Sequence, residues 1–325
     1  MRFLDVDGLG PVSRIGLGTW QFGSREWGYG DAYAAREAAA IVRQARELGI
    51  TLFDTAEVYG NGRSERILGA ALGDERADVV VASKVFPVAP FPVVVSSRLA
   101  GSARRLGLDR VPLYQVHWPN PLVPDSVTMP GLRQSLDAGR IGAVGVSNYS
   151  LARWQAADEA LGRPVVSNQV QFSLAAPSAL DDLVPFAERE GRMVMAYSPL
   201  AQGLLGGRYG VDHRPGGVRA LNPLFGTENL RRAQPLLDVL REVAEAHAVT
   251  PAQIALAWLV SLPRVVAIPG ASSVAQVEAN AAAADVDLRP DEQAALTAAA
   301  RTFRPVSAVR TLVERVQERV GAGRG

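Results

Sequence analysis

Four side chains able to move a proton stand at related places in this sequence: Asp54, Tyr59, Lys84 and His117. Asp54, Lys84 and His117 each end a short apolar run that is typical of a buried strand, and Tyr59 lies in the loop five residues after Asp54. Each alone has an ordinary structural explanation, such as a cap, loop packing or a solvated charge. Because three successive strand ends carry them, we expect them to meet in one polar cluster.

The chemistry that this group favours is proton donation by a tuned phenol. A free phenol has a pKa of about 10 and is a weak acid at neutral pH. A nearby ammonium would favour the phenolate, and a carboxylate behind that ammonium would keep it charged and oriented. We therefore expect Tyr59 to donate the proton, Lys84 to tune it and Asp54 to anchor Lys84. A hydrolytic site is disfavoured, because no Ser or Cys stands in a nucleophile-elbow motif.

The elements that would position these residues alternate regularly along the chain. Residues 1–12, with glycines between short apolar runs, predict a hairpin. Strands are predicted at 15–19, 50–55, 79–84, 112–117, 142–147, 165–170, 193–197 and 265–268. Helices are predicted at 32–48, 63–72, 92–106, 129–138, 151–161 and 179–190. This alternation predicts an α/β protein with one (β/α)8 TIM barrel, and the absence of GxGxxG after the first strand disfavours a Rossmann site.

The region after the seventh predicted strand departs from the alternation. Residues 203–233 are rich in Gly and contain Pro215 and Pro223, which predicts a long loop. Helices are predicted at 234–247 and 251–261, and Thr250 before Pro251 is a favourable start for the second. A last helix is predicted over 306–320. The chain, 1–325, is expected to be a single domain with its core at about 15–300.

Composition narrows the function classes. The net charge is +1 without a long basic run, so nucleic acid is not an expected partner. The chain has no cysteine, which excludes disulfides and thiolate metal sites, and no metal is expected. No apolar run reaches the roughly 18 residues of a membrane span, and no signal peptide is recognised. We expect a cytoplasmic protein that does not bind membranes, and the sequence leaves its oligomeric state open.

Eight blocks of sequence give the chain a family resemblance. They are GLGTWQFG (16–23), FDTAEVYGNGRSE (53–65), ASKV (82–85), YQVHWP (114–119), GVSNYS (145–150), NQVQFS (168–173), AYSPLAQGLL (196–205) and IPGASSVAQVEAN (268–280). From about Ile15 to Asn280 the chain resembles the aldo-keto reductases, and especially the bacterial branch similar to potassium-channel beta subunits. The resemblance implies reduction of an aldehyde or ketone by NAD(P)H. Asp54, Tyr59, Lys84 and His117 match the family's catalytic four, with His117 orienting the substrate oxygen.

The resemblance also implies a set of cofactor-binding residues. They are Gly18, Thr19, Trp20, Asp54, Ser147, Asn148, Gln169, Tyr197, Ser198, Leu200, Gln202, Leu204, Arg208, Ile268, Gly270, Ser272, Gln276 and Asn280. Ser147, Asn148 and Gln169 would hold the nicotinamide carboxamide, and Tyr197 would stack on its ring. Ser273 is a possible N-cap with Gln276 three residues on, a capping-box arrangement.

The residues that would choose between NADPH and NADH point in two directions. Gly270, Gln276 and Ala279 replace the Lys, Arg and Glu of the mammalian reductases, which at face value favours NADH. Ser272 and Gln276, however, match the channel-beta-like branch, which holds NADP with that pair. Arg208 lies where that branch has a phosphate-binding Lys, and Arg219 could close over the cofactor or be a solvated loop charge. NADPH is the expected cofactor, and NADH is possible.

The substrate pocket is expected to be aromatic. It would contain Trp20, Phe22, Tyr59, Phe86, His117 and Trp118, with Trp27, Tyr29 and Phe225 as further candidates. Asn120 stands where many relatives have Asp, which by itself identifies no substrate. A small-molecule carbonyl is therefore the expected partner. The alternative function is a cofactor-occupied redox-sensing or regulatory protein like the channel beta subunits, because both classes carry the same four residues.

Overall fold

A computed structural model describes residues 1–24 and 31–306, and it has the α/β architecture that the alternation predicts. Eight parallel strands form one sheet in chain order. They are β3 (Leu17–Gly18), β4 (Leu52–Asp54), β5 (Val80–Val85), β6 (Val111–Val116), β7 (Ile141–Ser147), β8 (Ser167–Gln171), β9 (Met193–Tyr197) and β10 (Val265–Ala267). Parallel bridges from Ile15 to Ala267 and from Gly18 to Gly270 join the first strand to the last. The fold is therefore a (β/α)8-like barrel.

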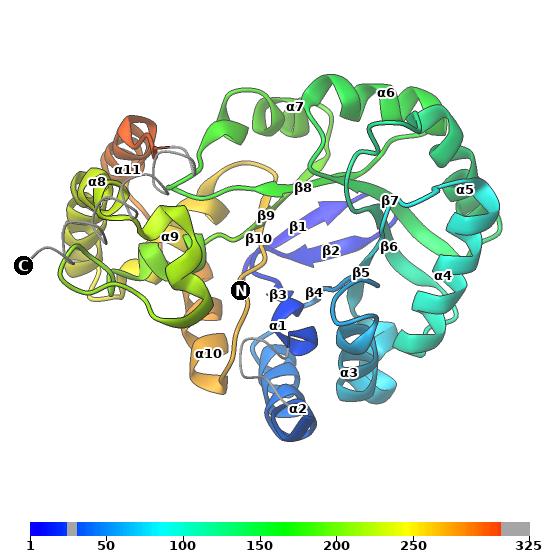
Figure 1. Ribbon diagram of the computed structural model, residues 1–325, viewed down its shortest axis with the longest axis horizontal. Helices are drawn as coiled ribbons and strands as arrows, with labels where there is room; N and C mark the ends of the chain where they lie inside the picture. The colour runs from blue at the N-terminus through cyan, green and yellow to red at the C-terminus, as the bar shows by residue number, and fades with distance from the viewer. Residues whose placement is uncertain (25–30, 307–325) are drawn as a thin grey trace, which may run out of the picture.

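Helices surround the sheet, as Figure 1 shows, with the N-terminal hairpin in the middle of the ring. They are α1 (Trp20–Gly23), α2 (Asp31–Glu47), α3 (Arg63–Leu72), α4 (Pro92–Leu106), α5 (Asp125–Asp137), α6 (Leu151–Leu161), α7 (Leu183–Arg189), α8 (Thr227–Ala246), α9 (Pro251–Ser261), α10 (Val274–Ala282) and α11 (Pro290–Thr302). No single helix in the described ranges has the length and apolar composition of a membrane span. The bent pair of α8 and α9 meets that test together, by length and composition only.

The predicted hairpin is confirmed, and it fills one end of the barrel interior. Strands β1 (Phe3–Val6) and β2 (Gly10–Ser13) pair antiparallel. Leu4, Val6 and Val12 belong to the same buried cluster as inward-facing strand residues such as Leu113 and Met195. This apolar plug closes the end of the barrel at which the parallel strands begin, so polar side chains are left at the opposite, carboxyl end.

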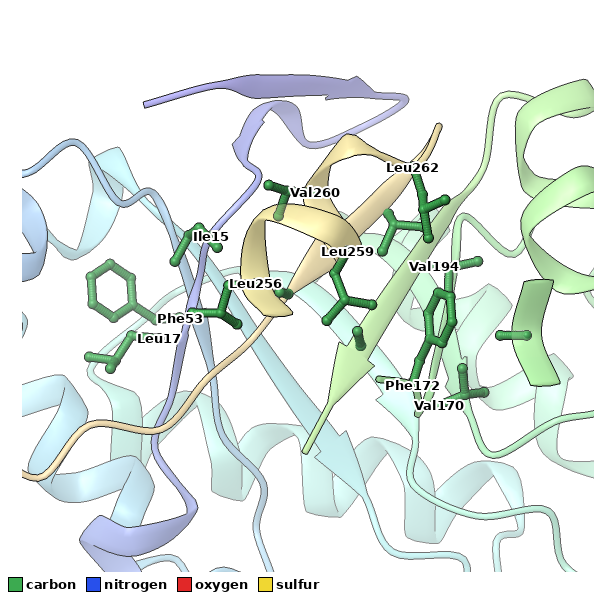
Figure 2. Close-up of a cluster of buried hydrophobic side chains, with 14 of the residues drawn as sticks. Ile15, Leu17, Phe53, Val170, Phe172, Val194, Leu256, Leu259, Val260 and Leu262 are labelled. Atoms are coloured by element: carbon green, nitrogen blue, oxygen red, sulfur yellow. The ribbon is translucent and has the colours of Figure 1, made fainter. Parts of the chain in front are cut away.

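The larger apolar core lies between the sheet and the helices. Alternate strand residues such as Phe53 and Val194 face it. Helix α9 is apolar on most of its surface, and Figure 2 shows Leu256 and Leu259 between Ile15 on one side and Val194 on the other. This packing fixes α9 against both the first and the seventh strand of the barrel.

Several element boundaries differ from the predictions. Helix α8 begins at Thr227, seven residues before the expected start, because Leu230 and Ala233 are buried against the core. The long loop after the seventh strand is consequently shorter, and it contains short 3-10 helices at 201–206, 217–221 and 223–225.

Other helices also depart from expectation. Helix α5 begins at Asp125 and passes through Pro130, and a short 3-10 turn followed by α7 replaces the helix predicted over 179–190. Helix α11 was not predicted. The predicted tail helix over 306–320, and also Trp27 and Tyr29, lie outside the described residues.

Candidate active site

The structure brings Asp54, Tyr59 and Lys84 into direct contact at the carboxyl end of the barrel. Lys84 is fully buried, and its ammonium donates to the Asp54 carboxylate at 2.7 Å, to the Thr55 carbonyl at 2.8 Å and to the Tyr59 hydroxyl oxygen at 3.3 Å. Because an ammonium has three donors, these three acceptors satisfy it completely. The position of the Lys84 ammonium is thus fixed by these three hydrogen bonds, one of which goes to Tyr59.

Tyr59 keeps its proton in this environment. Burial raises the pKa of the phenol above its usual value, and although the Lys84 charge acts in the opposite direction, it does not outweigh burial. The expected tuning by Lys84 is therefore present but is not the larger effect. Since the Tyr59 oxygen accepts a hydrogen bond from Lys84, its own O–H is left to donate away from the lysine.

Lys84 stays charged at neutral pH. Its burial lowers the pKa of the ammonium, but the Asp54 carboxylate and Tyr59 raise it further than burial lowers it, so the net direction is upward. A buried charge survives in a protein when it is paired and hydrogen-bonded, and both conditions are met here.

His117 lies beside Tyr59 at the end of β6. The two rings meet edge-on with centroids 5.7 Å apart. Burial and the nearby Lys84 charge lower the pKa of His117 to about 3, so the imidazole is neutral at physiological pH. Its Nδ1 is buried and has no hydrogen-bond partner among the described residues. A neutral imidazole can donate one hydrogen bond, which suits it to orient an oxygen near Tyr59.

Small hydroxyl residues hold this group in place, a role that the sequence did not predict for them. Thr19 Oγ1 donates to the Asp54 carbonyl at 2.8 Å, and Ser64 Oγ donates to the Thr19 carbonyl at 2.7 Å. Thr55 Oγ1 donates to Ser64 Oγ at 3.0 Å. All of these side chains are fully buried. Thr19 therefore supports Asp54 by its side chain, and the signal for Ser64 was its place in the quoted block 53–65.

The residues expected at the nicotinamide adjoin this group. Gln169 Nε2 donates to Asp54 Oδ1 at 2.7 Å. Ser147 Oγ donates to the Gln169 carbonyl at 2.8 Å, and Asn148 Nδ2 donates to Ser147 Oγ at 3.0 Å. Tyr197, partly exposed at the end of β9, donates its hydroxyl proton to Asn148 Oδ1 at 2.9 Å. The four therefore form one hydrogen-bonded chain that ends on Asp54.

The other expected cofactor residues lie in the segment after β9 and at the start of α10. We call the loops at the carboxyl ends of the barrel strands the rim. Ser198 and Gln202 have left-handed backbone conformations, with φ of 51° and 56°. Ser273 caps α10, as predicted, but Gln276 Oε1 accepts from Ser272 N at 2.8 Å, so the expected capping box with Ser273 is wrong. Gly18 forms a bridge with Gly270 at the closure between β3 and β10, Ile268 directly follows β10, and Asn280 is buried on α10. Arg208 is exposed.

Three residues expected at the site have fully buried side chains. Phe22, assigned to the substrate pocket, is fully buried in the apolar core between sheet and helices, as is Phe225. Leu204, assigned to the cofactor, is likewise fully buried, while Leu200 is only partly so. Aromatic and leucine side chains on short helical turns satisfy core packing as readily as a binding surface, and the sequence pattern is the same in both cases.

Phe86 and Trp118 pack against His117, which itself lies beside Tyr59. Phe86 and His117 meet edge-on with ring centroids 6.1 Å apart, and His117 and Trp118 stack at 6.5 Å. We call Phe86, His117 and Trp118 the aromatic wall. Trp20 and Trp118 are 45% and 46% exposed, an unusual exposure for tryptophan that leaves apolar surface available to a ligand.

This set of donors and surfaces fits a nicotinamide dinucleotide. Tyr197 offers a partly exposed aromatic ring held by Asn148, and the neighbouring amides of Asn148 and Gln169 match a carboxamide. Ser272, partly exposed before the first turn of α10, supplies a hydroxyl where helical N–H groups favour phosphate oxygens. The chemistry required at each end of such a molecule is therefore present on one rim.

Comparison with known proteins gives the same result. A model of the aldo/keto reductase family matches residues 14–301. An uncharacterized oxidoreductase of Mycobacterium tuberculosis is 71% identical over 98% of this chain and 99% of its own length. Methylglyoxal reductase of Escherichia coli is 34% identical over 91% of this chain and 93% of that protein.

Solved structures agree. An aldo/keto reductase from Klebsiella pneumoniae in complex with NADP and acetate superposes with a TM-score of 0.75, at 30% identity, over 94% of this chain and 96% of that one. The glycerol dehydrogenase of Gluconobacter oxydans superposes with a TM-score of 0.85, at 28% identity, over 94% and 97%. The chain therefore belongs to the aldo/keto reductase family of NAD(P)H-dependent oxidoreductases.

Proposed function

We propose that this protein reduces an aldehyde or ketone to an alcohol with NADPH, and that Tyr59 donates the proton. The observation that carries the proposal is the fully buried Lys84, whose three donors are bound to Asp54, Thr55 and Tyr59. Burying an ammonium is costly unless it is paired, and a core of this kind has no structural need for one. A phenol held by that ammonium beside a neutral imidazole is suited to carbonyl reduction.

The residues would divide the reaction as follows. The nicotinamide, when bound, supplies a hydride to the carbonyl carbon. His117, which is neutral, donates a hydrogen bond to the carbonyl oxygen and orients it toward Tyr59. Tyr59 then transfers its proton to that oxygen, and Lys84 stabilises the negative charge left on the phenolate. Asp54 keeps Lys84 charged throughout, with Gln169 holding the second carboxylate oxygen.

Binding of the nicotinamide end falls to the chain of Ser147, Asn148, Gln169 and Tyr197. Asn148 adopts a left-handed conformation with φ of 64°, which is uncommon for a residue other than glycine. That conformation is stabilised by side-chain bonds from Asn148 to Ser147 Oγ and to the His117 carbonyl. Strained backbone of this kind is retained where the local structure is required for a site.

NADPH is the proposed nucleotide, with NADH as the weaker one. Support comes from Arg208, an exposed cation on the segment after β9, and from Ser272 and Gln276 at the start of α10. Dissociation constants for NADPH and NADH, measured by quenching of tryptophan fluorescence, should differ in favour of NADPH by about tenfold, the effect of one charge-assisted contact. Arg208→Ala should remove most of that difference. Equal affinities in the wild type would refute the preference.

The test of the function itself is turnover. Purified protein is mixed with NADPH and a panel of aldehydes and ketones, and loss of NADPH absorbance is followed together with formation of the alcohol. The proposal expects catalytic turnover with at least one class of carbonyl. Binding of NADPH without turnover of any carbonyl would contradict it and would favour the regulatory alternative.

A further inference from the structure

Asn120 connects two loops that each carry a member of the aromatic wall. Its Nδ2 donates to the carbonyl of Pro87 at 2.7 Å, immediately after Phe86. Its Oδ1 accepts from the backbone N–H groups of Leu122 and Val123 at 2.7 and 2.8 Å. Asn120 itself follows Trp118 by two residues. One side chain therefore ties the loop after β5 to the loop after β6.

Only an amide can make this set of bonds. The carbonyl of Pro87 requires a donor, whereas the two N–H groups require an acceptor, so the network also fixes which atom of Asn120 is nitrogen. A carboxylate at this position would keep the two N–H bonds but would place an oxygen against the Pro87 carbonyl. The contact would then be repulsive instead of attractive.

The segment 117–120 is also held by residues of the loop after β7 and of helix α6. Asn148 Nδ2 donates to the His117 carbonyl at 3.2 Å, and Arg153 Nη2 donates to the Asn120 carbonyl at 3.0 Å. Arg153 is in turn fixed by Asp125, whose other carboxylate oxygen accepts from the Tyr149 hydroxyl at 2.6 Å. These bonds join the aromatic wall to the loop that carries Asn148 and to the first turn of α6.

Apolar packing contributes little to holding the loop after β6 on the side that faces the solvent. A hollow of about 760 Å³ lies there, lined among others by Pro121, Leu122 and Arg153. Leu122 is 89% exposed, so it buries little apolar area that could anchor the loop. Hydrogen bonds are consequently the main restraint on this part of the rim.

We propose that Asn120 is a specificity-determining positioning residue, which sets the placement of Phe86 and Trp118 relative to each other and thereby the fit of an aromatic carbonyl substrate beside Tyr59. The inference rests on the proposed function. Aromatic aldehydes are the substrate class whose reduction depends on the hydrogen bond from Asn120 to Pro87. Small aliphatic aldehydes reach Tyr59 and His117 without contacting Phe86 or Trp118, and so they do not depend on the bond between Asn120 and Pro87.

The experiment compares Asn120→Asp with the wild type on 4-nitrobenzaldehyde and on propanal, both with NADPH at saturation. We expect kcat/KM for 4-nitrobenzaldehyde to fall about tenfold, chiefly through KM, because ground-state placement and not the chemical step is disturbed. For propanal we expect both constants to stay within about twofold. The ratio of the two kcat/KM values is thus the readout that a general loss of structure would not move.

Two further variants complete the design. Asn120→Ala removes the Pro87 bond without adding charge, and its specificity ratio should fall in the same direction. Gln155→Glu adds the same charge at an exposed position on α6 and should leave the ratio unchanged. Circular dichroism confirms that each variant is folded.

The outcomes separate cleanly. An unchanged ratio in Asn120→Asp, an equal loss for both aldehydes, or a wild-type ratio in Asn120→Ala would each overturn the inference while leaving the proposed function intact. Failure of the wild-type protein to reduce either aldehyde would also overturn the inference, whereas the proposed function fails only if no aldehyde or ketone of the panel is turned over.

Discussion

At the scale of single residues, the site is governed by the needs of one buried charge. Lys84 lies in the barrel interior without solvent contact, and its stability there depends on Asp54 at 2.7 Å. Two further residues of the site complete the hydrogen bonds of this ion pair. Tyr59 accepts one from the Lys84 ammonium, and Gln169 donates one to the Asp54 carboxylate. The residue types could be identified from the sequence because strand ends placed them together. The bond from Gln169 to Asp54 could not, because it joins residues 115 positions apart.

The same charge sets the pH response of His117. Burial and the Lys84 charge lower its pKa to about 3, so protonation does not occur between pH 5 and 8. We therefore expect kcat/KM for carbonyl reduction to show no acid-side fall near pH 6.5, the usual pKa of histidine. The measurement is a pH profile at saturating NADPH. An acid limb near pH 6.5 that disappears in His117→Gln would contradict this assignment.

At the scale of elements, alternation in the sequence predicted most of the barrel. The boundaries of β9, α3, α4, α6 and α9 agree with the expected ranges, because each has clear turn or capping residues at its ends. The prediction failed where local signals and packing disagree. Helix α8 contains Pro235, and its first turns follow a Gly-rich stretch that reads as a loop. The sequence also did not show that the side chains of Phe22 and Leu204 are fully buried, because the same apolar residues suit a core and a binding surface.

Close packing of α3 on α4 gives a prediction at this scale. A Cβ added at Gly69 would lie 2.5 Å from the backbone oxygen of Leu106, whereas one added at Gly101 would meet only the side-chain guanidinium of Arg105, at 3.1 Å. Both glycines are inside helices. Gly69→Ala should lower the free energy of unfolding by about 1–3 kcal/mol, the usual range for overpacking.

Gly101→Ala is the matched control. The better helix propensity of alanine should leave its stability unchanged or raise it by up to about 1 kcal/mol. Urea unfolding followed by circular dichroism measures both variants. Equal stability of the two variants would show that the helices are not in close contact at Gly69.

At the scale of the whole molecule, the barrel is closed by parts that lie outside the repeating units. The β1–β2 hairpin fills the end opposite the site, and α11 packs on α8. The hairpin was predicted from its glycines and short apolar runs. Helix α11 was missed, although Pro290 in its first turn and Glu292, which accepts a hydrogen bond from Arg289 N, are recognisable signals of a helix start.

A buried acid joins α11 to α8. Glu292 Oε2 contacts His247 Nε2 at 2.8 Å and accepts from Arg289 N at 2.8 Å. Burial raises the pKa of Glu292, but these hydrogen bonds lower it by more, so the net pKa lies below its usual value. A carboxyl whose pKa is depressed by folding stabilises the protein above its unfolded pKa of about 4.3, and this stabilisation is lost as the pH falls through the folded value.

The consequence is testable with Glu292→Gln. At pH 7 the variant should have a lower melting temperature than the wild type, and the difference should shrink as the pH is lowered from 5 to 3. Thermal unfolding at each pH, followed by circular dichroism, gives the comparison. A difference that stays constant over this range would show that the charge of Glu292 contributes nothing to the docking of α11.

The central claim is that Tyr59 supplies the proton for carbonyl reduction, and Tyr59→Phe tests it most directly. The variant keeps the ring that packs edge-on to His117 but loses the hydroxyl that Lys84 contacts. At saturating NADPH, reduction of 4-nitrobenzaldehyde should slow by at least about 100-fold, the contribution of a general acid. The dissociation constant for NADPH should stay close to that of the wild type. A variant that binds NADPH and reduces the aldehyde at nearly the wild-type rate would contradict the account.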